Sequence, residues 1–464
     1  MPRLPKASFC ALLPLLVTAC GADSGSTKSP GGSTSTSTPS SGSVQESATS
    51  EAYTALTAGD RDKLTQIISD LDGVVAKDPS DGRSTFYSAL MRFWQFGDQI
   101  NLPSNPADVV TDAQTMIDRF RKAQAMLPDD DRAPAFGGLA KVIMGNTFGD
   151  LPAPSDGAML EAFEIIARLG KRIVVHAENP SIMARRQGQL EKAGRADVVA
   201  HLQARPAICE IEAVSRAIHF AEWTGARLHI AHKSSKDALD IVRQAKARGV
   251  DVTVETCPQY LLLDTTHMAK LGNVMRVNPP IREPGHAEPL WQALRDGVVD
   301  MLATDHAPHS IPEKTAANVW QCCSGFPGVE TAVPLMLTEV AAGRISLAHY
   351  VKLTAMAPAK AWGLYPRKGA LQVGSDADIA IVDLKREGRI SAADLHSKSK
   401  ITPFEGRAVR GVPVATLVRG TVVARDGQVV GSPGWGKPVA QAMAAPAPRN
   451  ADWTSAAIVR PPRF

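Results

Sequence analysis

The chain has 464 residues, of which 44% are hydrophobic and 21% charged, and this composition excludes a chain that is disordered throughout. Its 51 basic and 47 acidic residues give a formal net charge of +4, too balanced a charge to indicate a nucleic-acid partner. The six cysteines have neither the paired spacing of a structural zinc site nor the density of a disulfide framework. We therefore expect the last four cysteines to be reduced thiols.

The first 44 residues have the pattern of an export signal followed by a tether. Arg3 and Lys6 precede an apolar stretch from Phe9 to Val17, and small residues lead to Cys20. Residues 1–20 resemble a bacterial lipoprotein signal peptide with Cys20 as the lipidated residue, which predicts a membrane-anchored, extracytoplasmic protein. If the segment is not processed, the protein is cytoplasmic. Residues 21–44 are rich in Gly, Ser and Thr, as flexible tethers are.

Residues 45–133 have helical patterning. Apolar side chains recur three and four positions apart, and the segment from Asp78 to Gly82 separates two predicted helices. This unit contains no histidine or cysteine that could bind a metal ion. We predict an all-helical unit whose role stays open.

From residue 136 to 366, short β-branched runs alternate with amphipathic helices. We expect strands within 141–144, 172–179, 227–235, 250–263 and 300–309, and helices within 157–170, 210–225 and 236–249. This alternation is typical of an α/β fold with βα units and a parallel sheet. Residues 367–432 read as short strands with Gly-Asp turns and predict a small β unit, and residues 433–464 form an irregular tail.

Three of the predicted strands end in side chains that bind metals. His176, His232 and Asp305 lie at the carboxyl ends of their runs, where functional residues gather in βα barrels. Imidazoles and carboxylates hold zinc, and metal-assisted hydrolysis also needs a base that moves the proton of water. One histidine at a strand end is usually structural, but three such ends in βα units of one chain indicate a metal site.

Residues 136 to about 432 resemble the cyclic amidohydrolases, the group of dihydroorotases, allantoinases and hydantoinases. The matching stretches are KVIMGNTFG, VVHAEN, HIAHKSS, ETCPQYLLL, RVNPPIR, ATDHAPHS, SGFPGVETAVPLML and KGALQVGSDADIAIVDL. The resemblance implies a partial TIM (β/α) barrel of the metal-dependent amidohydrolase type. DHAPHS and NPPIR favour dihydroorotase, whereas RPAICEIEAVSRAI is equally typical of allantoinases.

The resemblance also implies a ligand set. Lys141 matches a carboxylated lysine that bridges two zinc ions, and His176 and His232 match the imidazole ligands of one ion. Asp305 matches the residue that contacts metal and acts as general base and acid. The cofactor would be one or two Zn²⁺ ions.

For the substrate, the resemblance implies contacts from Asn278 and His309, with the backbone at Pro327 and Gly328 closing over the ring. The implied reaction is hydrolysis or closure of a ring amide, first of all the interconversion of dihydroorotate and N-carbamoyl-aspartate, with allantoinase or hydantoinase activity as alternatives. We expect a small cyclic amide or ureide as substrate, no nucleic acid, membrane association only through Cys20, and a homo-oligomer.

The chain also departs from the family pattern. The family's first barrel strand ends in His-x-His, but His176 is the first of the eleven histidines in this sequence. About five of eight βα units are present, so we predict weak or absent catalysis. Two alternatives stay open: a non-catalytic, lipid-anchored protein that carries a degenerate amidohydrolase portion, and a pseudoenzyme that binds a metabolic partner. Zinc content would separate the first alternative from the enzyme.

Overall fold

The structure is a computed structural model. It describes residues 140–144, 153–437 and 439, together with scattered positions between 63 and 76. The predictions for the signal segment with Cys20, for the tether, for most of the helical unit and for the tail beyond 439 lie outside the described residues. Among the described helices, none combines the length and apolar character needed to cross a membrane.

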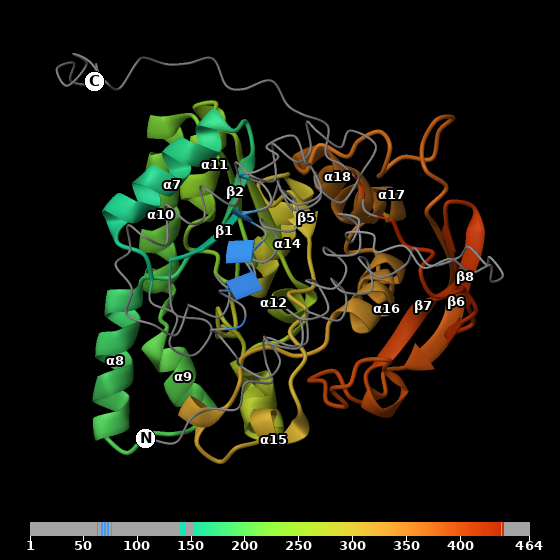
Figure 1. The fold of residues 1–464 in the computed structure, drawn as a ribbon. Helices are drawn as coiled ribbons and strands as arrows, with labels where there is room; N and C mark the ends of the chain where they lie inside the picture. Colours follow the sequence, from blue (N-terminus) through green and yellow to red (C-terminus); the bar gives the residue numbers. More distant parts are fainter. Residues whose placement is uncertain are drawn as a thin grey trace, which may run out of the picture. The chain divides into compact units, whose positions relative to one another are not determined.

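The centre of the described fold is a five-stranded parallel sheet (Figure 1). Its strands follow one another in chain order: β1 (Ala140–Ile143), β2 (Arg172–His176), β3 (Arg227–Ile230), β4 (Val252–Thr256) and β5 (Met301–Leu302). All five residues of β2 are buried, as expected for a parallel strand covered on both faces. The prediction of an α/β fold with a parallel sheet is confirmed.

Helices connect consecutive strands. The connections hold α7 (Asp156–Arg168), then α8 (Pro180–Lys192), α9 (Val198–Ala204) and α10 (Ala207–Thr224), then α11 (Leu239–Ala247), and after β4 α12 (Pro258–Leu262), α13 (Met268–Leu271) and α14 (Ala287–Arg295). Local sequence sets several ends, because the side chains of Ser155, Asn179 and Asp197 accept backbone N–H groups as N-caps. Gly225 ends α10 in the left-handed conformation.

Four of the predicted runs are longer than the strands they contain, and the runs 250–263 and 300–309 differ most from their strands. The run 250–263 was expected to be one strand, but β4 ends at Thr256 and Pro258 begins α12. A proline cannot donate to the sheet and suits the first turn of a helix, so the apolar residues after it pack as a helix. β5 has only two residues, and the polar segment after it is a loop.

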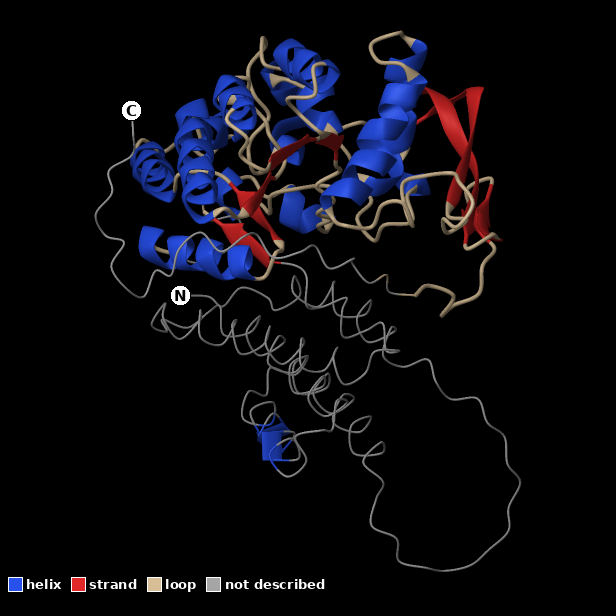
Figure 2. Ribbon diagram, turned by 90° about the horizontal axis from the view of Figure 1, so that it is seen from above, coloured by secondary structure: helices blue, strands red, loops and turns tan. Residues whose placement is uncertain are grey.

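The segment after β5 adds helices and a second sheet. The helices are α15 (Ile311–Lys314), α16 (Val329–Ala341), α17 (Leu347–Val351), a π-helical turn (Lys352–Met356) and α18 (Ala357–Ala361), and short 3₁₀ turns occur at Thr265–His267, Gly272–Met275, Val319–Gln321 and Ala392–Asp394. The second sheet is antiparallel, with β6 (Ile379–Arg389), β7 (Ala408–Val418), β8 (Thr421–Arg425) and β9 (Gln428–Val429) in order. Figure 2 shows its strands to one side of the helices that surround the first sheet.

Helix α16 packs closely on β7 at Gly411. This glycine has φ 95°, and a Cβ there would lie 2.6 Å from the Cβ of Leu337. We expect Gly411→Ala to lower the free energy of unfolding by about 2–4 kcal/mol, since it adds a clash to a backbone that alanine adopts poorly. Gly427→Ala is the matched control, because Gly427 has φ 78° with nothing within 4 Å of its added Cβ. Equal losses for the two variants in denaturant unfolding would contradict the close packing.

Candidate functional site

Two of the predicted ligands meet at the carboxyl ends of neighbouring strands. His176 is the last residue of β2, and His232 lies two residues after β3. Nδ1 of His176 is 2.9 Å from Nε2 of His232, and both side chains are buried. The parallel register places them there, because Val175 pairs with Ile230 and its carbonyl accepts the N–H of Ala231.

A buried carboxylate lies within hydrogen-bond distance of the other ring nitrogen of His176. Nε2 of His176 donates to Oε2 of Glu178 at 2.9 Å, and Nη1 of Arg205 donates to the same oxygen at 2.5 Å. Burial raises the pKa of Glu178, but the charge of Arg205 and the hydrogen bond from His176 outweigh it and hold that pKa below its usual value. With Nε2 protonated, Nδ1 of His176 presents its lone pair toward His232.

The spacing of these two nitrogens matches that of two imidazoles bound to one zinc ion. Two imidazole nitrogens bound at 2.0–2.1 Å to a tetrahedral zinc ion are separated by about 3.3 Å, close to the 2.9 Å between Nδ1 of His176 and Nε2 of His232. A carboxylate on the second nitrogen of a ligating histidine is also the usual outer partner in such sites. Within the described part of the chain, no group of three or more His, Cys, Asp or Glu side chains is arranged to hold a metal ion.

The other two predicted ligands stay predictions. Lys141 lies on β1, beside Val174, and its side chain is outside the described residues. Asp305 lies three residues after β5 and is partly exposed. Burial raises the pKa of Tyr260 well above its usual value, and the negative charge of Asp305 adds to this, so Asp305 lies within electrostatic reach of Tyr260.

Both His232 and Asp305 have a strained backbone. Their φ angles are 38° and 46°, in the left-handed region that residues other than glycine rarely adopt. The other two non-glycine residues of this kind in the described chain, Arg419 and Asp426, lie in tight turns of the second sheet. Strain of this kind costs about 1–3 kcal/mol per residue and is found at functional sites. Nothing in the residue pattern predicted this strain.

The loop after Asp305 folds back onto its own start. A Cβ on Gly328 would lie 2.8 Å from the carbonyl oxygen of Thr304, so the backbone at Pro327 and Gly328 lies against the strand end that carries Asp305. Nδ1 of His306 accepts the N–H groups of Gly328 and Val329 at the start of α16. This explains a histidine to which the sequence assigned no role.

The two predicted substrate contacts differ in their hydrogen bonding. Nε2 of His309 donates to the carbonyl of Ser324 at 3.0 Å, so this nitrogen already holds the loop together. Asn278, which precedes a cis peptide bond to Pro279, is 8% exposed, and its Oδ1 is buried without a hydrogen-bond partner among the described residues. An unsatisfied buried oxygen is costly, and a ligand N–H would satisfy it.

Sequence reasoning missed the charged residues beneath the site. Glu178 lies in the motif VVHAEN and Arg205 begins the motif RPAICEIEAVSRAI, but the sequence assigned no role to either residue. A second buried group joins Glu210, Lys233 and Arg282. Only burial distinguishes them from ordinary surface charges. His229 contacts Glu255 at 3.0 Å and Thr253 at 2.9 Å.

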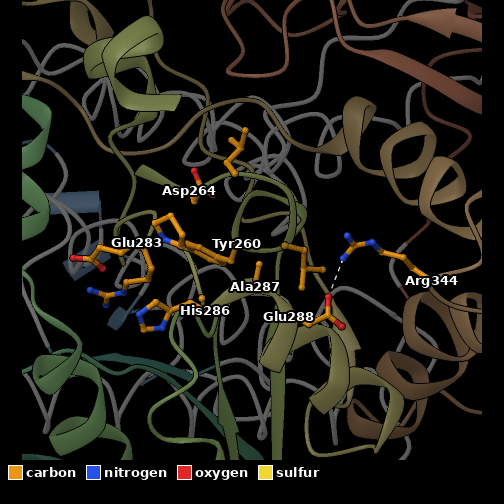
Figure 3. Close-up of a pocket in the computed structure, with 12 residues that line it drawn as sticks. Tyr260, Asp264, Glu283, His286, Ala287, Glu288 and Arg344 are labelled. Atoms are coloured by element: carbon orange, nitrogen blue, oxygen red, sulfur yellow. Dashed lines mark hydrogen bonds and ion pairs between the residues drawn. The ribbon is translucent and has the colours of Figure 1, made fainter. Parts of the chain in front are cut away.

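A pocket of about 250 Å³ lies beside α12 and the start of α14 (Figure 3). Tyr260, Asp264, His286 and Glu288 line it, and Arg344 contacts Glu288. None of the predicted site residues is among its lining residues. The candidate site is therefore the histidine pair and its neighbouring loops.

Comparison with known proteins agrees with this geometry. Residues 130–423 match the family described as Amidohydrolase family. The chain belongs to the amidohydrolase family. It is 40% identical over 303 residues to an L-hydantoinase of Paenarthrobacter aurescens, and the match covers 65% of this chain and 66% of that relative. It is 36% identical over 289 residues to a D-phenylhydantoinase of Escherichia coli O1:K1 / APEC, covering 61% of this chain and 63% of the relative.

Solved structures give the same amidohydrolase neighbours. The L-hydantoinase (dihydropyrimidinase) from Arthrobacter aurescens matches with a TM-score of 0.62 and 40% identity, covering 64% of this chain and 67% of that one. The dihydropyrimidinase from Brevibacillus agri NCHU1002 matches with a TM-score of 0.66 and 30% identity, covering 74% and 72%. The chain thus spans slightly less than two thirds of the length of the two curated relatives it matches.

Proposed function

We propose that this chain is a zinc-dependent hydrolase of cyclic amides, of the hydantoinase or dihydropyrimidinase class. The observation that carries the proposal is the convergence of His176 and His232, whose facing nitrogens are 2.9 Å apart at the carboxyl ends of parallel strands. The names of the relatives support the substrate class, since those proteins are hydantoinases and dihydropyrimidinases. The proposal includes a partial barrel as the fold, with one or two zinc ions.

The relatives favour the hydantoinase alternative over the dihydroorotase function that DHAPHS and NPPIR suggested. These motifs carry Asp305, His309 and Asn278, which we assign to proton transfer and to the ring amide. Proton transfer and contact with the ring amide are needed to open any of these rings. The motifs therefore do not discriminate the ring substituents, which separate dihydroorotate from a hydantoin.

Each residue has a distinct part in the proposed reaction. A bound zinc ion would polarise the amide carbonyl and lower the pKa of water. Asp305 would take a proton from the attacking water and return it to the departing ring nitrogen. Oδ1 of Asn278 would accept a ring N–H, which supplies the partner that this buried oxygen lacks among the described residues. The backbone at Pro327 and Gly328 would cover the ring.

Ring opening by the purified full chain tests the proposal. We expect zinc-dependent opening of phenylhydantoin or dihydrouracil that exceeds any opening of dihydroorotate. Asp305→Asn should lower this rate by about 10²–10⁴-fold, since it removes the proton-transferring group. His219→Ala, a change at an exposed histidine of α10, should leave the rate unchanged.

Two results would contradict the proposal. No opening of any of the three rings would contradict the proposal, and a lack of bound zinc as well would favour the non-catalytic alternative. Equal rates for the wild-type protein and Asp305→Asn would remove Asp305 from the reaction. A slow but zinc-dependent rate would agree both with the proposal and with the weak catalysis that the missing His-x-His predicts.

A further inference from the structure

We propose that Glu178 is a positioning residue that holds His176 in the one tautomer able to bind a metal ion. The proposal rests on the proposed function, because it concerns the same histidine pair. It assigns a task to a residue that the sequence did not single out.

The carboxylate of Glu178 is fully buried and binds through one oxygen. Its side chain is 0% exposed, and Oε2 accepts from both Nε2 of His176 and Nη1 of Arg205. Its Oε1 has no hydrogen-bond partner among the described residues. The position of Oε2 therefore determines which atom of His176 must be a donor.

Only one tautomer of His176 satisfies this contact. A carboxylate accepts hydrogen bonds, so the proton of neutral His176 must lie on Nε2. Nδ1 is then an acceptor facing His232, and the same lone pair is what a metal ion needs. In the other tautomer, a proton on Nδ1 would block the metal side and leave Nε2 facing a carboxylate with no proton between them.

Arg205, the hydrogen-bond donor to this carboxylate, is itself held by further contacts. The backbone carbonyl of Arg205 accepts from Nη1 of Arg282 at 2.5 Å. Arg282 is in turn bound to Glu210 at 3.2 Å. This chain of contacts leaves Glu178 little freedom to rotate away from His176, so the tautomer is set before any metal binds.

A purely structural role for Glu178 is the competing explanation, because a buried carboxylate beside Arg205 stabilises the fold in any case. The two explanations differ in what happens to metal affinity. Loss of a structural ion pair lowers stability alone, whereas loss of a positioning group lowers metal affinity as well. Outer partners of this kind are typically worth about 10–100-fold in metal affinity.

The experiment uses three variants and two measurements. Glu178→Met removes the acceptor, and Glu178→Gln keeps one acceptor oxygen for His176. Asp251→Leu is the control, since it also takes the carboxylate from a buried arginine, Arg172, at the opposite end of the strands. Zinc affinity is measured by competition with a chromophoric chelator. The tautomer of His176 is measured in the metal-free protein by NMR of ¹⁵N-labelled histidine.

We expect the wild-type protein to have its His176 proton on Nε2. Glu178→Met should bind zinc about 10–100-fold more weakly, Glu178→Gln should recover most of that loss, and Asp251→Leu should match the wild-type affinity. Unchanged affinity in Glu178→Met would overturn the positioning role while leaving the proposed function standing. A proton on Nδ1 of His176 in the wild-type protein would overturn it whether or not the variants fold. If the wild-type protein binds no zinc, the proposed function fails as well.

Discussion

Replacement of Glu210 by methionine is expected to lower the free energy of unfolding by about 3–5 kcal/mol, because it leaves two buried cations without their carboxylate. Glu210 lies on α10 with 2% of its surface exposed. Lys233 donates to Oε1 at 2.7 Å, and Arg282 donates to Oε2 at 3.2 Å. Ser234 adds its backbone N–H at 2.9 Å and its hydroxyl at 2.7 Å, so each oxygen accepts two hydrogen bonds.

The shifted acidity of Glu210 agrees with this. Burial raises its pKa, but Lys233 and Arg282 outweigh burial and lower the pKa to about 2. Denaturant unfolding of Glu210→Met and of Glu222→Met gives the comparison. Glu222 lies on the same helix and pairs with Arg248 at the surface, so its loss should cost less than about 1 kcal/mol. Similar losses at the two positions would show that the buried network contributes no more than a surface pair.

The second large effect is the contribution of Lys314 to the pH dependence of the free energy of unfolding. This lysine is 0% exposed, and its ammonium donates to the carbonyls of Arg276 at 2.7 Å and Cys323 at 3.1 Å. Burial and the nearby positive charge of Arg276 lower its pKa to about 7. In the unfolded chain the lysine has its ordinary pKa of 10.5. The unfolded state therefore binds more protons than the folded state between about pH 7 and 10.5.

Stability must consequently rise with pH in that window. Below about pH 7 the lysine is charged in both states, and the cost of burying the charge is fully present. We expect the free energy of unfolding of the wild-type protein, relative to Lys314→Met, to rise by at most about 4–5 kcal/mol between pH 6.5 and 10.5. Subtracting the variant removes the titration of the shared groups whose pKa values do not depend on Lys314, which leaves Lys314 together with Cys322 and Cys323 beside it.

The measurement is denaturant unfolding of both proteins at several pH values across this range. Lys270→Met, at an exposed lysine of α13, should give a curve parallel to the wild type. A Lys314→Met curve that also runs parallel would mean that Lys314 keeps its ordinary pKa in the folded protein. The result matters for the site, because Lys314 joins the loop that begins at Asp305 to the segment that carries Asn278.

The sequence predicted the parts of this fold that depend on repeating patterns. Alternating apolar runs and amphipathic helices indicated a parallel sheet, and the order of β1 to β5 confirms it. The pattern overextended the run 250–263, because periodicity does not register the change from strand to helix that Pro258 imposes. It also treated the segment before Asp305 as a long strand, although β5 has two residues.

For the candidate site, the sequence identified the residues that present chemical groups but not those that hold them. His176 and His232 could be predicted because each ends an apolar run. Glu178 could not, since a glutamate two residues after a strand is indistinguishable in sequence from a solvated charge. Its role depends on an arginine 27 residues later, Arg205, and contacts of that range follow only from the packed fold.

The left-handed backbone at His232 and Asp305 has a consequence for how this chain can change. Glycine would adopt those angles without strain, so replacement of either residue by glycine removes a functional group and relieves the main chain at once. At these two positions, selection for a more stable fold would favour glycine, whereas selection for activity would favour the histidine and the aspartate. A screen of variants for heat resistance alone would therefore tend to accumulate proteins that have lost their reactive groups.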